Sequence, residues 1–123
     1  MIADNQKRIL EIILRMDETD GFPFVLSTFL TDRKNDLYFA VYKRYAGEGN
    51  PYYEVKLNSM VYHASDLRKC LKIAFDNSLY WEKISGRKEL ASWFSGFLDL
   101  LHDDSIINRI LNRLKSLFKR FWK

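Results

Sequence analysis

The sequence has few of the residues from which catalytic and metal sites are built. It contains one cysteine, Cys70, and two histidines, His63 and His102, in 123 residues. A single cysteine cannot form an intramolecular disulfide, and zinc sites usually need three or four ligands. We therefore expect a cytoplasmic protein with no disulfide, no metal and no cofactor.

Glycine, proline and long apolar runs are scarce as well. Five glycines and two prolines beside 47% apolar residues are typical of a folded domain and not of a disordered chain. No stretch approaches the roughly 18 apolar residues of a membrane-spanning helix. Acidic residues interrupt the first 20 positions, which argues against a signal peptide. At this length we expect a single domain, 1–123.

Acidic residues are absent after Asp104. The following segment contains six Lys or Arg side chains, whereas residues 1–104 carry 14 basic and 16 acidic side chains. A chain that is near neutral for most of its length and basic at one end indicates a local contact with something anionic.

Hydrophobic periodicity predicts the element order αβββααα. Apolar residues three and four apart predict helices over 5–16, 65–78, 85–101 and 105–123, and stretches rich in Phe, Tyr and Val predict strands over 22–30, 37–45 and 52–62. The loops between the strands are short and polar, so we expect an α+β fold with a three-stranded antiparallel meander. The predicted core residues are Phe24, Leu26, Phe39, Val41, Val55, Leu57, Leu71, Phe75, Phe94 and Phe97.

The predicted C-terminal helix, 105–123, is basic and amphipathic. At about 100° per residue its apolar side chains occupy one arc of roughly 160°, and every Lys and Arg lies outside that arc. A helix of this kind can lie in a membrane interface. It resembles the C-terminal membrane-targeting helices of peripheral proteins such as bacterial cell-division actin homologues. The predicted contact residues are Arg109, Arg113, Lys115, Phe118, Lys119, Arg120, Phe121, Trp122 and Lys123.

Two other uses of this helix stay open, because the helix can be either docked or protruding. Its apolar arc can pack on the domain's own sheet, in which case the basic residues are only a solvated face. Alternatively, the arc can enter a groove on a protein partner.

Nucleic acid is the alternative partner. Residues 4–77 have the element order αβββα of double-stranded RNA-binding domains, which usually carry a Lys-Lys cluster at the start of the second helix. This sequence has Ser65-Asp66-Leu67-Arg68-Lys69 there, so the resemblance is weak at the residues that would meet phosphates. Acidic neighbours also dilute the basic patch that would carry this function, which comprises Arg33, Lys34, Arg68, Lys69 and Lys72.

Tyrosines are frequent in the predicted strands. On a shared exposed face they would offer stacking platforms to single-stranded bases or a contact surface to a protein. We expect instead that most have a buried ring and a solvated hydroxyl. The tyrosines concerned are Tyr38, Tyr42, Tyr45, Tyr52 and Tyr53.

No catalytic constellation is apparent. Cys70 lies seven residues from His63, but it belongs to an apolar helical stripe, where a buried and inert thiol is expected. The Gly47-Glu48-Gly49 run lacks the third glycine and the helix of a phosphate-binding loop. We therefore predict a non-catalytic interaction protein of the adaptor, inhibitor or immunity type. Its partner is a protein or the anionic inner face of a membrane.

Overall fold

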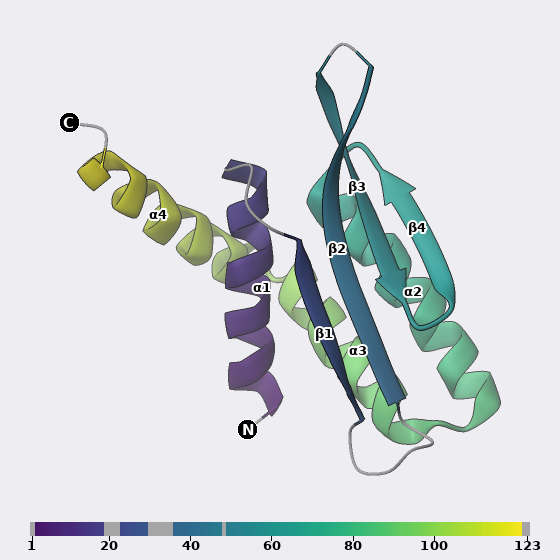
Figure 1. The fold of residues 1–123 in the computed structure, drawn as a ribbon. Coiled ribbons are helices and arrows are strands. Elements are labelled where there is room, and N and C mark those ends of the chain that lie inside the picture. The colour runs from purple at the N-terminus through teal and green to yellow at the C-terminus, as the bar shows by residue number, and fades with distance from the viewer. Residues whose placement is uncertain (1, 19–22, 30–35, 48, 122–123) are drawn as a thin grey trace.

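The computed structural model describes residues 2–18, 23–29, 36–47 and 49–121. Four helices and four strands follow one another in the order αββββααα (Figure 1). The α+β class is as predicted, but there is one strand more than expected. The elements are α1 Ile2–Glu18, β1 Phe24–Phe29, β2 Asp36–Ala46, β3 Asn50–Leu57, β4 Met60–Ala64, α2 Leu67–Ser85, α3 Lys88–His102 and α4 Asp104–Phe121.

The strands form an antiparallel meander in the order β1-β2-β3-β4. The additional strand arises because the predicted third strand folds back on itself at Asn58-Ser59. Asn58 has a φ of 51°, a left-handed conformation that asparagine tolerates and that two-residue hairpin turns require. Its backbone N–H donates to the Tyr38 carbonyl at 2.8 Å, which ties the turn to β2.

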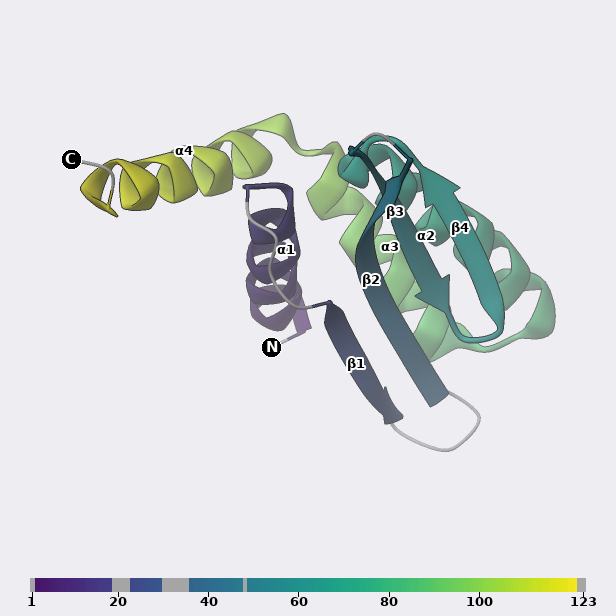
Figure 2. The ribbon, with the colours of Figure 1, turned by 45° about the horizontal axis from the view of Figure 1, so that its top comes forward.

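One face of the sheet is covered by α2 and α3, while the opposite face carries no helix (Figures 1 and 2). Side chains alternate between the two faces along each strand. On the covered face, Val41 pairs with Val55, and Val55 pairs with Tyr62. On the open face, Tyr42 pairs with Glu54 and Glu54 pairs with His63.

Aromatic rings fill the centre of the core. Phe39 is fully buried and makes edge-to-face contacts with four other rings at centroid distances of 5.3–6.0 Å. Such pairs stabilise a core beyond the area that they bury. Eight of the ten predicted core residues are buried, and Phe24 and Leu26 are partly buried at the β1 edge. The contacting rings are Phe24, Phe75, Trp93 and Phe97.

The boundaries of α2 differ from the prediction. Asp66, and not Ser65, caps its start by accepting a hydrogen bond from the Arg68 N–H. The helix does not end at residues 77–78 but continues to Ser85, because Ser78 is buried and the Asn77 side chain donates to the Ile73 carbonyl within the helix. Gly86 ends it with a φ of 77°, a conformation that favours glycine.

Helix α1 packs against α3 at the β1 side of the sheet. Its buried Gln6 side chain donates to the Trp93 carbonyl at 2.7 Å. A Cβ atom at Gly96 would lie 2.8 Å from Gln6 Oε1, closer than real contacts permit, so glycine allows this close approach. Leu10 and Ile13 then enter the core from α1.

Candidate interface for an anionic surface

Helix α4 is fixed to the body at its first turns. Ile107 is buried, and Ile106, Ile110 and Leu111 are partly buried against the core. The helix contacts α1 and α3, crosses α1, and continues past it, so that its C-terminal half projects from the body (Figures 1 and 2). The first half of α4 is therefore docked on α1 and α3, and its second half projects from the body.

Arg68 of α2 is hydrogen-bonded to the junction between α3 and α4. Its guanidinium donates two hydrogen bonds to the Leu101 carbonyl, at 3.1 and 2.7 Å, and one to Asp104 Oδ1 at 2.6 Å. The Arg68 hydrogen bond and its charge hold the pKa of Asp104 below its ordinary value. Asp103 caps the helix by accepting from the N–H groups of Ser105 and Ile106. The junction between α3 and α4 is thus held by hydrogen bonds from three elements.

Cationic side chains from α1 and α4 meet where the helices cross. A groove of about 400 Å³ is lined by Lys7, Arg8, Glu11, Ile12, Arg15 and Arg113. A second groove of about 220 Å³ lies beside it, with Arg109, Ile106 and Ile110 in its wall. We call this region the α1–α4 basic surface, and we define it by five cationic residues: Lys7, Arg8, Arg15, Arg109 and Arg113.

Glu11 is the single acidic residue in the walls of both grooves. Its Oε1 atom lies 3.9 Å from Arg15 and 3.7 Å from Arg113. These are long ion pairs to exposed partners, so each contributes little to stability. One carboxylate against five cations leaves the α1–α4 basic surface strongly positive, as contact with an anionic surface requires.

The contribution of α1 to this surface was not predicted. Lys7, Arg8, Glu11 and Arg15 occupy one polar face of a helix, at spacings of one, three and four residues. That pattern is typical of any solvated helix face. Only the crossing of α1 by α4 brings it next to Arg109 and Arg113, and no sequence pattern indicates this crossing.

The predicted α4 contact residues separate into three groups. Arg109, Arg113 and Lys115 are exposed; Arg109 and Arg113 face α1, whereas helical geometry places Lys115 on the other flank of the apolar arc. The side chains of Phe118, Lys119, Arg120 and Phe121 lie outside the described part of the structure, as do Trp122 and Lys123 entirely.

The basic patch of the nucleic-acid alternative is only partly described. Arg68 is engaged in the α3–α4 junction and is not free to meet a phosphate. Lys69 and Lys72 lie on the solvent side of α2, while Arg33 and Lys34 lie outside the described residues. The described residues of this patch therefore place two cations, not a cluster, on the surface.

The tyrosines divide between the two faces of the sheet. Tyr53 is buried in the core, as expected, and Tyr45 is exposed near the β2–β3 hairpin. Tyr38, Tyr42 and Tyr52 are half-buried and share the open face by register. Other side chains already contact two of these rings. The Arg44 and Lys56 cations lie 4.8 and 5.3 Å from the Tyr42 ring centroid, and the His63 and Tyr52 ring centroids are 5.9 Å apart. These contacts compete with stacking on bases.

Glu54 connects the charged residues of the open face. Its carboxylate accepts from Arg44 at 3.0 and 3.3 Å and lies 2.9 Å from His63 Nε2. The hydrogen bond with His63, which has the larger effect, and the hydrogen bonds from Arg44 lower the pKa of Glu54. Glu54 is therefore already paired with side chains of its own sheet and is not free to bind a charged ligand.

Cys70 is buried, as expected. Its Sγ lies 3.5 Å from the carbonyl oxygens of Tyr53 and Tyr62, and burial raises its pKa to about 11. His63 pairs with Glu54 and not with this thiol. A protonated thiol without a base is a poor nucleophile.

Comparison with known proteins gives no relative for this chain: no family model, curated protein or solved structure matches it. Within the described residues, no three His, Cys, Asp or Glu side chains gather in a way that could hold a metal ion. None of the helices, as far as they are described, is both long and apolar enough to cross a bilayer. The surfaces of the described residues are therefore the features that bear on function.

Proposed function

We propose that this chain is a non-catalytic interaction protein that attaches peripherally to an anionic membrane, with the α1–α4 basic surface against the headgroups. The observation that carries the proposal is the meeting of five cations from two helices beside a single carboxylate. The inner face of the cell membrane, reached from the cytoplasm, is the anionic surface that this proposal implies.

The course of α4 favours a membrane over nucleic acid. Its sequence continues the apolar arc of Ile107 and Ile110 through Leu114 and Leu117 into the projecting half of the helix. A helix that joins an apolar arc to flanking cations suits the boundary between headgroups and acyl chains. A phosphate backbone offers nothing that would cover such an arc.

The test compares two double variants with the same net charge. Arg8→Ser/Arg109→Ser removes two cations from the α1–α4 basic surface, and both side chains are exposed. Lys43→Ser/Lys88→Ser removes two cations elsewhere. Each cation near a membrane surface contributes about 1 kcal/mol, so the first variant should bind vesicles containing phosphatidylserine about thirtyfold more weakly, measured by co-sedimentation. The control should bind like the unmodified chain.

The outcome also depends on lipid and salt. Binding should require anionic lipid and weaken as salt is raised, because exposed charges are screened. Equal binding of both double variants, or binding to neutral phosphatidylcholine vesicles at the same strength, would contradict the proposal. Binding of a DNA or RNA duplex that the first variant loses, without vesicle binding, would favour the nucleic-acid alternative.

A further inference from the structure

A second surface lies at the other side of the molecule, where β4 ends the sheet above α2. Among the described residues, nine large apolar side chains are exposed, and six of them lie on these two elements. Scattered apolar residues on a surface are ordinary, but a concentration of this kind indicates an interaction site. We call it the β4–α2 edge, and its residues are Met60, Val61, Ile73, Tyr80, Trp81 and Ile84.

We propose that the β4–α2 edge binds an extended segment of a protein partner, which adds to the sheet as a fifth strand beside β4 and carries both apolar and acidic side chains. This site is independent of the proposed attachment to membranes, because it shares no residue with the α1–α4 basic surface.

The main chain of β4 is available for strand addition. β4 pairs with β3 on one side and is the last strand of the sheet. In a two-residue hairpin the residues that flank the turn, here Leu57 and Met60, form a hydrogen-bonded pair. Hydrogen-bonding direction alternates along a strand, so the N–H and C=O groups of Val61 and His63 point away from β3. These groups are the template that an added strand uses.

The side chains of α2 provide a wall beside that edge. Ile73, Tyr80 and Ile84 recur at spacings of seven and four, with Trp81 adjacent, so they share one side of the helix. Cys70, on the same flank of α2, contacts the carbonyls of β3 and β4, which shows that this flank faces β4. Tyr80 and Trp81 pack edge to face at 5.4 Å.

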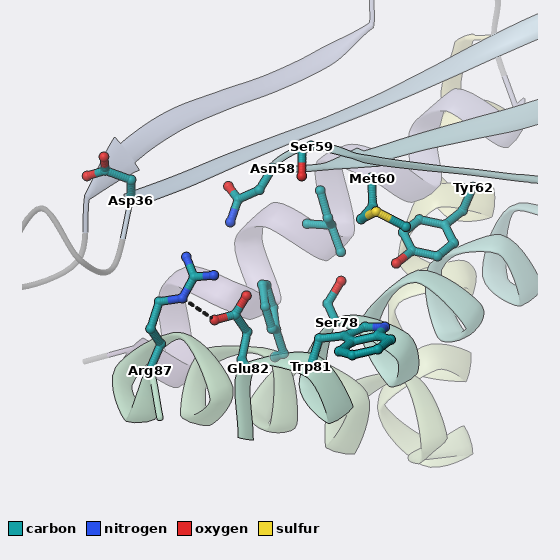
Figure 3. A pocket seen from close by; sticks show the side chains of 11 residues that line it. Asp36, Asn58, Ser59, Met60, Tyr62, Ser78, Trp81, Glu82 and Arg87 are labelled. Atoms are coloured by element: carbon teal, nitrogen blue, oxygen red, sulfur yellow. Dashed lines mark ion pairs between the residues drawn. The ribbon is translucent and has the colours of Figure 1, made fainter. Parts of the chain in front are cut away.

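A pocket of about 590 Å³ lies at the turn end of β4 (Figure 3). Met60 and Tyr62 form one wall, and Trp81 lies opposite on α2. The buried Glu82 carboxylate is neutralised by Arg87, whose Nε lies 2.8 Å away. The remaining wall is mixed, with Leu57 and Phe94 beside the polar side chains Asp36, Asn58, Ser59 and Ser78. The apolar part between β4 and Trp81 suits a large apolar side chain of the partner segment.

Charge indicates the chemistry of the partner. On α2, Lys69 and Lys83 project beside Ile73 and Tyr80, with Asp76 as the one carboxylate among them. On the open face, Lys56 of β3 pairs in register with Val61 of β4. A cationic side chain therefore lies next to the edge on each face. A second copy of the chain would bring like charges together, which is unfavourable, whereas acidic side chains on alternate faces of an added strand would meet these cations.

The test is selection from a phage-displayed library of random peptides against the intact protein. Selected peptides should alternate apolar and acidic residues, and they should shift the amide resonances of Val61 and His63. Val61→Pro removes an outward N–H at an edge position that tolerates proline and should weaken binding at least tenfold, as should Trp81→Ala. Val61→Ala keeps the N–H and loses only part of one apolar side chain, so it should weaken binding less than Val61→Pro does. Ile12→Ala, on α1, should bind normally.

Any one of the following results would overturn the proposal. Selected peptides could be basic or show helical spacing, or bind Val61→Pro as well as the unmodified protein. No enrichment over a parallel selection on Val61→Pro would also count against it. Self-association that Val61→Pro abolishes, measured by analytical ultracentrifugation, would show that the edge pairs with a second copy. Vesicle binding should be unchanged in Val61→Pro, so failure here is distinguishable from failure of the membrane proposal.

Discussion

The two sides of this molecule use opposite chemistry. The α1–α4 basic surface presents five cations and one exposed apolar side chain, Ile12. The β4–α2 edge presents six exposed apolar side chains and the outer edge of β4, which has no neighbouring strand among the described residues. A positive surface attracts anionic partners from a distance without a shaped site. An apolar edge works only at contact, through fit and main-chain pairing.

The C-terminal helix alone indicates neither the full extent of the positive surface nor the position of the apolar edge. The charge excess of the sequence lies after Asp104, but α1 contributes three of the five cations of the described positive surface and α4 contributes two. No run of charged residues in the sequence marks the β4–α2 edge. The two surfaces share no residue, so variants can perturb both, one or neither.

The largest effect is expected from Phe39→Ala, which should damage both surfaces together. Phe39 is fully buried and contacts four aromatic rings, so its removal should lower the free energy of unfolding by about 3–5 kcal/mol. Chemical denaturation measures this. Val25→Ala, on the open face of β1, should cost less than about 0.5 kcal/mol; a similar loss in both variants would contradict the assigned core.

Arg68→Met should perturb the α1–α4 side alone. It removes the donors to the Leu101 carbonyl and to Asp104, and we expect a loss of about 1–2 kcal/mol. Hydrogen exchange should accelerate in α4 and remain unchanged in β4. Lys69→Met is the control, because it removes one positive charge at the neighbouring position of α2. Hydrogen exchange in α4 should be unaltered in this variant. Faster exchange throughout the chain in Arg68→Met would show that Arg68 does not act locally.

Gly86→Ala should perturb the β4–α2 side. No atom lies near the added methyl group, but the φ of 77° is strained for alanine, so the cost should be about 1 kcal/mol. Gly47 also faces open space and has no such φ. Gly47→Ala should therefore be near neutral in thermal denaturation. Equal effects of the two substitutions would argue against the left-handed end of α2.

The smallest effect should come from Glu54 on the open face, which belongs to neither surface. Its pKa is lowered in the folded state, so its stabilisation is complete above the ordinary glutamate pKa of about 4.3 and is lost as pH falls through the lowered value. Arg44 and His63 are exposed partners, which limits the contribution to less than about 1 kcal/mol. In Glu54→Gln this part of the pH dependence should disappear from denaturation curves; an unchanged pH profile would contradict the network.

Much of the fold follows from local sequence pattern, and the errors have local causes. The helices and the buried alternation of Tyr53, Val55 and Leu57 were predictable because periodicity reports burial directly. The β3–β4 turn was missed because Asn58-Ser59 interrupts an apolar pattern that continues on both sides. Residues 77–78 read as a helix end because their polar side chains favour turns, yet both are satisfied inside α2.

The candidate surfaces were less predictable than the fold. The crossing of α1 by α4 places three α1 cations, Lys7, Arg8 and Arg15, in one surface with those of α4. The extension of α2 to Ser85 places Tyr80 and Trp81 beside β4. Both depend on contacts between elements distant in sequence. Residue pattern reports which face of a helix is apolar, but not what lies next to it.

Hydrogen exchange of the protein, free and bound to vesicles containing phosphatidylserine, shows directly which surface contacts the membrane. Binding should slow exchange in α1 and α4 and leave β4 and α2 as they are in solution. Protection of β4 and α2, with α1 and α4 unchanged, would contradict the assignment of the α1–α4 basic surface as the membrane contact.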